Sequence, residues 1–289
     1  MVFQSQATVA HDRSEKPPSP IHGPPTSSLV VRRDVSLLVF LADQQEAEGQ
    51  GTDGTSTLPP PALPHSRTLA PRTGVNPLVI VGAGGLGRET AFLVEQINDA
   101  APADAAPWDL RGFVDDAPAL QERQVQDQPV RGDVDWLCRR RALHYVLAIG
   151  DPAVRRRLAA RLDDAPPRAA SLIHPSVRLH DTTHVGAGSI LCKGVTPTVN
   201  VSIGRHAVLD SHVTVGHDAT VEAFATLHPG VHLSGNGRLG KGARLGAGAV
   251  VLPGVQVGAQ TTVGAGAVAH RDLPENCTAV GVPARCLDR

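Results

Sequence analysis

His217 and Asp218 are the adjacent side chains of this sequence best suited to acid–base chemistry. Imidazole titrates near neutral pH, so it can take a proton from an attacking amine or hydroxyl group. A carboxylate beside an imidazole favours the protonated ring and can fix its tautomer. The pair predicts a general base with its orienting group, and the alternative is a solvated turn.

A glycine-rich turn is the second candidate site. Gly82, Gly84, Gly85 and Gly87 lie between the runs LVIV and RETAFLVEQIN, which predict a buried strand and an amphipathic helix. Backbone amides at such a turn, together with the start of the helix, can bind an anionic diphosphate. The alternative is that the glycines only permit close packing of the strand against the helix.

Two acidic residues, Asp115 and Asp116, end the next predicted strand, LRGFVDD. A nicotinamide enzyme needs an acidic residue about 20 positions after the glycine turn to hold the ribose. Asp115 and Asp116 lie 28 and 29 positions after Gly87. The spacing therefore argues against a dehydrogenase.

The element that carries His217 is predicted by a six-residue period. From Ile173 onward an aliphatic residue recurs at every sixth position in 15 of 16 repeats, and Pro197 is the exception. A fixed period of six predicts a parallel β-helix in which the aliphatic side chains fill the core and three repeats make one coil, so 16 repeats give about five coils. His217 comes two positions after the core residue Val215, which places it on the outer wall.

Residues 77–170 carry strands that alternate with helices, which predicts a small parallel sheet of the doubly wound kind. Beyond the helix RETAFLVEQIN, two further helices are predicted at DVDWLCRRR and DPAVRRRLAARL, and a further strand at HYVLAIG. Residues 1–76 hold 10 of the 24 prolines among Ser, Thr and Gly, a composition that predicts a disordered extension. The predicted organisation is thus 1–76, 77–170 and 171–289.

Charge and composition exclude several classes of function. Lys and Arg number 27 against 28 for Asp and Glu, so no basic surface for nucleic acid or an anionic membrane is expected. No apolar run near the start approaches the ~18 residues of a membrane span. Cys138, Cys192, Cys277 and Cys286 contain no CxxC pair, and they predict buried free thiols in a reducing, cytoplasmic compartment.

Six motifs, in order, give the chain from Leu78 to Arg289 a resemblance to a known family. They are GAGGLGRE, GFVDD, AIGD, HPSV, VGHDATVEAF and VGVPAR. The chain resembles the NeuD/PglD-like sugar O- or N-acyltransferases, members of the trimeric left-handed hexapeptide-repeat acyltransferase superfamily. The resemblance implies an α/β half-Rossmann domain followed by a left-handed parallel β-helix, and a homotrimer. It leaves the predicted extension, 1–76, unexplained.

The resemblance also implies roles for individual residues, with acetyl-CoA as co-substrate and no metal. His217 would accept the proton and Asp218 would strengthen it as a base. The residues at positions that bind the nucleotide-sugar acceptor are Gly84, Gly85, Leu86, Asp115, Asp116 and Gly150. Those at coenzyme A positions are Thr226, Gly235, Ala247 and Ala265. Leu86 and Thr226 stand where relatives can have histidine, and His228 is an alternative to Thr226.

Two other functions stay open beside the acyltransferase. Gamma-class carbonic anhydrases share this prism and bind zinc through histidines, and His212 lies five residues before His217, as in that class. A further ligand would lie two coils before His212, where this chain has Ser176. The third function is a noncatalytic nucleotide-sensing scaffold. We predict an acetyl-CoA-dependent acetyltransferase acting on an amino or hydroxyl group of a nucleotide-activated sugar.

Overall fold

The computed structural model describes residues 75–102 and 105–287. All of them belong to one compact unit, Leu63–Arg289. The disordered extension predicted over residues 1–76 therefore falls outside the described residues, apart from its last two positions. Within the described ranges, no helix combines the length and the apolar character needed to cross a membrane.

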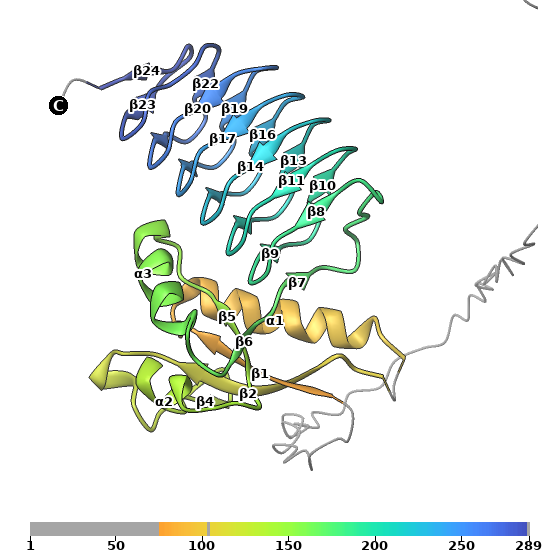
Figure 1. Cartoon of the computed structure of the whole chain (residues 1–289), viewed down its shortest axis with the longest axis vertical. Coiled ribbons are helices and arrows are strands. Elements are labelled where there is room, and N and C mark those ends of the chain that lie inside the picture. Colours follow the sequence, from red (N-terminus) through yellow and green to blue (C-terminus); the bar gives the residue numbers. More distant parts are fainter. Residues whose placement is uncertain (1–74, 103–104, 288–289) are drawn as a thin grey trace, which may run out of the picture. The chain divides into compact units, whose positions relative to one another are not determined.

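The described part of the chain begins with a four-stranded parallel sheet, in the strand order β2-β1-β5-β6, and three α-helices (Figure 1). Its elements are β1 Asn76–Val81, α1 Gly85–Asp99, β2 Trp108–Val114, the 3₁₀ helix η1 Pro118–Leu120, β3 Gln124–Val125, β4 Gln128–Pro129, α2 Val134–Cys138, β5 His144–Leu147, α3 Pro152–Leu162 and β6 Arg168–Ala169. The predicted doubly wound sheet is confirmed. The short β3–β4 hairpin was not predicted.

The central strand β1 is buried on both faces, as expected for a parallel sheet covered by helices. Leu78 and Ile80 pack in the cluster that contains the apolar face of α1. Val79 and Val81 pack in a second cluster with residues of α2 and α3. The alternation along β1 thus places α1 on one face of the sheet and α2 and α3 on the other.

From Leu172 onward, strands of mostly two residues build a parallel β-solenoid with three sheets (Figure 1). The β9 sheet contains β7 Leu172–Ile173, β9 Ile190–Leu191, β12 Val208–Leu209, β15 Thr226–Leu227, β18 Arg244–Leu245, β21 Thr262–Val263, β23 Thr278–Val280 and β24 Arg285–Cys286. The β8 sheet contains β8 His184–Val185, β11 Ser202–Ile203, β14 Thr220–Val221, β17 Arg238–Leu239 and β20 Gln256–Val257. The β10 sheet contains β10 Thr196–Pro197, β13 Thr214–Val215, β16 His232–Leu233, β19 Val250–Val251 and β22 Val268–Ala269.

The predicted six-residue period is the period of the solenoid. Val208 pairs with Thr226, and Thr226 pairs with Arg244, so one coil takes three hexads. The second residue of most strands, such as Val215 or Leu227, is completely buried in the solenoid core. A residue with positive φ recurs every sixth position at the corners, for example at Gly188, Asn200 and Asp218.

The solenoid has about six coils, one more than the predicted five, because its last coil breaks the period. The β9 sheet continues from Thr262 to Thr278, a step that falls two positions short of the three hexads of earlier coils. A coil of this length is out of phase with the hexads. A search for a fixed period therefore stops before β23.

Pro197, the exception in the hexad pattern, still occupies a strand and is buried. Strand β10 is the first of its sheet and pairs only with β13. Thr196 and Thr198, on either side of the proline, donate their amides to the next coil, so the proline nitrogen faces the open edge. Proline has no amide hydrogen to donate and is therefore tolerated there.

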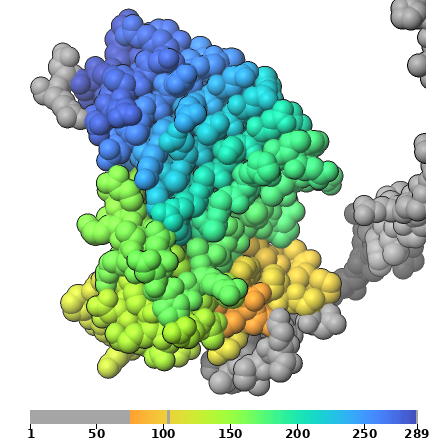
Figure 2. Space-filling view, in the orientation of Figure 1, coloured from red at the N-terminus to blue at the C-terminus, as the bar shows by residue number. Residues whose placement is uncertain are grey.

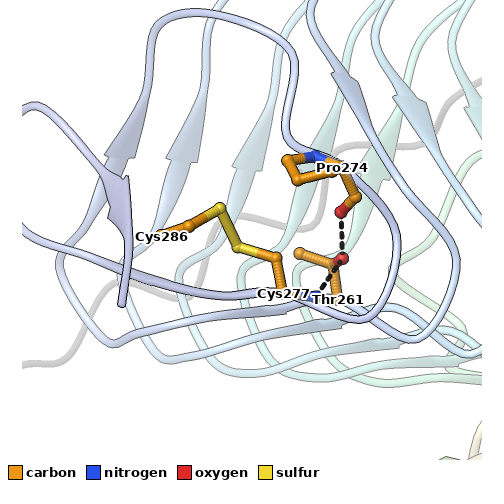
Figure 3. Close-up of a disulfide and its surroundings, with 4 residues drawn as sticks. All are labelled: Thr261, Pro274, Cys277 and Cys286. Carbon is orange, nitrogen blue, oxygen red and sulfur yellow. Dashed lines mark hydrogen bonds between the residues drawn. A yellow bond between two sulfur atoms is a disulfide. The ribbon is translucent and has the colours of Figure 1, made fainter. Parts of the chain in front are cut away.

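A disulfide in the last coil corrects the prediction of four free thiols (Figure 3). Cys277 precedes β23, and Cys286 lies in β24, which pairs antiparallel with β23 through Ala279 and Cys286. Their Cα atoms are 5.8 Å apart, and the sulfur atoms are bonded. Figure 3 shows Thr261 beside this bridge, donating to the carbonyl of Pro274 and accepting from the amide of Cys277. The spacing of the cysteines gives no sign of the antiparallel return that brings the two together.

Cys138 and Cys192 are free, as predicted, although both are half-buried and not fully buried. Burial raises the pKa of the Cys192 thiol to about 12. This thiol therefore stays protonated and unreactive at neutral pH.

Candidate active site

The candidate base lies at the corner where the chain leaves β13 of the β10 sheet for β14 of the β8 sheet. Nδ1 of His217 lies 2.8 Å from Oδ2 of Asp218. An ionised carboxylate can only accept a hydrogen bond, so Nδ1 carries the proton and Nε2 is the nitrogen left free to accept one. The pairing predicted from the sequence is thus present in the folded chain, and 60% of the His217 side chain is exposed.

Asp218 is itself fixed by a residue of the preceding coil. Nδ2 of Asn200 donates to Oδ1 of Asp218 at 2.9 Å. The hydrogen bonds from His217 and then from Asn200 lower the pKa of Asp218 below its usual value. The carboxylate therefore remains ionised, and each of its two oxygens accepts a hydrogen bond from a different residue.

Gly235, one coil after His217, leaves room for the imidazole. A Cβ added at Gly235 would lie 2.4 Å from Nε2 of His217. Gly235 was predicted to contact coenzyme A, and Asn200 was not predicted to belong to the site. Both positions are found by stepping one full coil from the His–Asp pair, back from Asp218 and forward from His217.

The four glycines of the turn after β1 fall into two pairs, one required by the packing of the turn and one not. Gly82 has φ +103°, and a Cβ on Gly87 would lie 2.0 Å from the carbonyl oxygen of Gly82. Gly87 is thus required by the close approach of α1 to the end of β1. Gly82 is required by its positive φ and by the carbonyl oxygen of Ala148, which would lie 2.8 Å from an added Cβ. A Cβ on Gly84 or Gly85 would meet nothing within 4 Å, so close packing does not explain them.

Leu86 follows in the first turn of α1, where its half-buried side chain packs against the core beneath that helix. Helix α1 begins after Gly84 without a side-chain cap. Gly84 and Gly85 are exposed at this start. The open backbone of the turn therefore faces solvent at the carboxyl end of β1.

The acidic pair holds the neighbouring loops in place. Oδ2 of Asp115 accepts from the amide of Ala83 in the glycine turn at 2.9 Å. Oδ1 of Asp116 accepts from the amide of Val134 at the start of α2, also at 2.9 Å. Both carboxylates lie at the carboxyl end of β2, and that of Asp115 lies beside the glycine turn.

Gly150 and Thr226 meet, although they are far apart in the sequence. Oγ1 of Thr226 lies 3.4 Å from the carbonyl oxygen of Gly150 and accepts from Nη2 of Arg155 at 2.8 Å. Thr226 is 2% exposed. The Thr226 hydroxyl is thus buried and hydrogen-bonded where the loop after β5 meets strand β15.

The other predicted coenzyme A positions lie on a different corner from His217. Ala247 and Ala265 are exposed, one coil apart, where the chain passes from the β9 sheet to the β10 sheet. His228 lies on that same corner and accepts from Nε of Arg244 at 3.3 Å. Burial, followed by the charge of Arg244, lowers the pKa of His228, so its ring is neutral.

A cavity of about 380 Å³ opens between the start of α3 and strands β18, β21 and β23 of the β9 sheet. Three cationic side chains line it, Arg156, Lys241 and Arg244, together with one carboxylate, Asp151. The excess of positive charge suits an anionic ligand. These residues were not predicted, because they come from separate elements that only the fold brings together.

No group of three or more His, Cys, Asp or Glu side chains in the described ranges is placed to hold a metal ion. Structural and catalytic zinc sites need three or four protein ligands. The described part of one chain therefore supplies no ligand set of the kind that the hydratase alternative requires.

Known proteins match about three quarters of the chain. Residues 77–162 match the family model described as the PglD N-terminal domain. A mutant of perosamine N-acetyltransferase from Caulobacter crescentus, solved in complex with CoA and GDP-perosamine, is 32% identical, with a TM-score of 0.65 over 75% of this chain and 98% of that one. The acetyltransferase domain of PglB from Neisseria gonorrhoeae, in complex with acetyl coenzyme A, is 28% identical, with a TM-score of 0.67 over 74% and 100% of the two chains.

A further relative matches a shorter stretch of the chain. A serine acetyltransferase from Synechococcus elongatus is 34% identical over 111 residues, which are 35% of this chain and 46% of that protein. The chain spans about half the length of the curated relatives it matches.

Proposed function

This chain belongs to the NeuD/PglD-like sugar acyltransferases of the hexapeptide-repeat superfamily, and we propose that it transfers an acetyl group from acetyl-CoA to an amino or hydroxyl group of a nucleotide-activated sugar. The observation that carries the proposal is the His217–Asp218 pair, with 2.8 Å between Nδ1 and Oδ2. An imidazole held in this tautomer has Nε2 free to take a proton, which acyl transfer to an amine or hydroxyl requires.

In the proposed reaction the acceptor nitrogen or oxygen attacks the thioester carbonyl carbon while Nε2 of His217 takes its proton. Asp218 stabilises the imidazolium that forms. The tetrahedral intermediate then collapses, the carbon–sulfur bond breaks, and the imidazolium returns the proton to the thiolate of coenzyme A. Backbone amides stabilise the oxyanion in the intermediate.

The acceptor side is proposed to be the carboxyl edge of the sheet. Strand β1 is paired with β2 on one side and with β5 on the other, so the strand order reverses at β1. In open α/β sheets a ligand crevice forms at such a point. The exposed backbone of Gly84 and Gly85 lies at this edge, and helix α1 starts there with its positive end. These features suit the diphosphate of a nucleotide sugar, with Leu86, Asp115, Asp116 and Gly150 around it.

The donor side is proposed to be the small-residue corner with Ala247 and Ala265, where His228 would lie near the thioester. Thr226 would support this corner from the strand that leads into it, and Gly235 would meet the donor from the corner of His217. Exposed alanines and glycines let a ligand approach the main chain closely. Since His217 lies on a different corner of the same solenoid, a complete site would use His217 of one copy and the donor corner of another. This arrangement is the basis for proposing a homotrimer.

A thiol-release assay tests the proposal. The full chain is incubated with acetyl-CoA and a panel of nucleotide amino sugars and sialic acids, and we expect free CoA only when a sugar acceptor is present. Mild alkali distinguishes the products, because an O-acetyl ester is hydrolysed and an N-acetyl amide persists. Release of no CoA with any sugar, or hydration of CO2 by protein containing stoichiometric zinc, would contradict the proposed function.

A further inference from the structure

Arg155 has the largest fully buried side chain of the described residues. It lies in the first half of α3 and has no measurable exposure. Its acceptors are the carbonyl oxygens of Ile149 (2.7 Å), Gly150 (3.2 Å), His206 (3.2 Å), Phe224 (2.6 Å) and Ala225 (3.2 Å) and the hydroxyl of Thr226 (2.8 Å).

These acceptors come from three separate segments of the chain. Nη1 binds the loop after β5, Nε binds the corner that holds His206, and Nη2 binds the segment that leads into β15. A guanidinium has five N–H donors in a rigid fork, and all three nitrogens are used here. Figure 2 shows the surface around α3, drawn in green, in contact with the cyan and blue coils of the solenoid.

The charge of Arg155 is not neutralised by direct pairing, because in the described chain no carboxylate hydrogen-bonds to it. Burial lowers its pKa to about 10, so the group is still a cation at neutral pH. A buried cation is costly unless its donors are satisfied. Main-chain carbonyl dipoles fill that role, and the bonds hold only while the three segments keep their relative positions.

We propose that Arg155 is a positioning residue, which sets the acceptor loop at Gly150 at a fixed distance from the acyl-transfer coil at Thr226. This inference rests on the proposed function and deepens it. Transfer requires the reacting atoms to be about 3 to 3.5 Å apart, and a misplacement of about 1 Å can cost about 100-fold in rate. An error in this junction therefore lowers kcat even when each substrate still binds.

The test compares Arg155→Lys with Arg205→Lys. Lysine keeps the charge but has three donors on one atom, so it cannot bridge three segments. Arg205 is the matched control, since it also joins α3 to the solenoid, through Asp163 at 2.9 and 3.0 Å. Its side chain is 47% exposed, and it contacts neither Gly150 nor Thr226.

We expect Arg155→Lys to lower kcat about 100-fold, while the dissociation constants of coenzyme A and of the sugar that turns over stay within about twofold. Arg205→Lys should keep the kcat of the wild type. Amide hydrogen exchange should accelerate over residues 149–154 in Arg155→Lys only. Should Arg155→Lys fail to fold, Thr226→Val removes one acceptor and should give a smaller fall in kcat with the same pattern.

Three outcomes would overturn the proposal: unchanged kcat in folded Arg155→Lys, loss of both binding affinities in parallel with kcat, or unchanged exchange at residues 149–154. The exchange measurement needs no substrate. It therefore tests Arg155 even if the wild-type chain released no CoA with any sugar, a result that would count against the proposed function alone.

Discussion

At the scale of single residues, the stacking of coils orients the candidate base. The carboxylate beside His217 in sequence would not by itself fix the ring, because both side chains are largely exposed. Asn200 from the coil before holds Asp218, and the missing side chain of Gly235 in the coil after makes space for Nε2. Three successive coils thus define one tautomer and one direction for the proton acceptor.

Replacing His217 with alanine should lower kcat by about 100-fold to 10⁴-fold, the usual cost of losing a general base. Asp218→Asn should cost less, since the base remains but loses its orienting carboxylate. His180→Ala is the control, because His180 is an exposed histidine of the same solenoid whose ring bonds to the neighbouring Thr182. Thiol release by correctly folded His217→Ala at the wild-type rate would exclude His217 as the base.

Gly235→Ala should displace the imidazole and lower kcat roughly 10-fold to 100-fold with the fold intact. The corner itself accepts a side chain, since Val199 and Pro253 occupy the corresponding position in other coils. The atoms nearest to the new Cβ would be those at the end of the His217 ring, which can rotate away. In a His217→Ala background the same change should have no further effect, and an equal loss in both backgrounds would refute this explanation.

His206 predicts how stability depends on pH. Its ring is 2% exposed and stacks between Tyr145 and Phe224, and burial lowers its pKa from the usual 6.5 to about 4. The unfolded chain therefore binds a proton more readily, so stability is full above about pH 6.5 and falls by about 3 kcal/mol as the pH drops toward 4.

Urea unfolding at pH 7.5 and 4.5 measures this dependence. His206→Phe keeps the stacking and removes the titrating group, so it should lose about 2 to 3 kcal/mol less than the wild type between these two pH values. If both proteins lose the same stability, His206 is not the group responsible.

At the scale of elements, the sequence predicted the features that follow from a local pattern of residues. It did not predict those that depend on segments far apart in the sequence or on a break in the six-residue period. The hexads located the solenoid core, and the GAGGLG turn located β1 and α1. We did not predict the last coil, with its step from Thr262 to Thr278, or the Cys277–Cys286 disulfide, because this part of the chain departs from the six-residue period. Arg155 could not be found at all, since its partners His206 and Thr226 lie 51 and 71 positions away in the sequence.

The glycine turn offers a test that separates binding from packing. Gly85→Ala should leave stability unchanged or raise it by about 0.5 to 1 kcal/mol, because alanine is the better helix residue and its Cβ meets open space. If the diphosphate rests on this backbone, the KM for the nucleotide sugar should rise about tenfold while the KM for acetyl-CoA stays constant.

Gly87→Ala is the contrasting variant, because its Cβ would lie 2.0 Å from the carbonyl oxygen of Gly82. It should destabilise the fold, which thermal unfolding would detect. An unaltered KM for the sugar in stable Gly85→Ala would return the glycine turn to a purely structural role.

At the scale of the whole molecule, the positions of the site residues favour assembly. His217 lies where the β10 sheet gives way to the β8 sheet, and Ala247 and Ala265 lie where the β9 sheet gives way to the β10 sheet. One solenoid cannot fold these corners onto each other, because each corner is held by the pairing of every coil with the next. Cyclic association of three-sided solenoids would bring unlike corners of neighbouring copies together.

We therefore expect light scattering to report about three times the 30.2 kDa of one chain across a dilution series. Coexpression of His217→Ala with Ala265→Arg, each expected to be strongly impaired alone, should restore activity, because a mixed trimer contains about one site in three with an intact base and an intact donor corner. The matched mixture of His217→Ala with Asp218→Asn should regain nothing beyond the residual rate of Asp218→Asn, since both changes fall on the same corner. A fully active monomer, or failure of the first pair to complement in confirmed mixed trimers, would show that base and donor corner work within one chain.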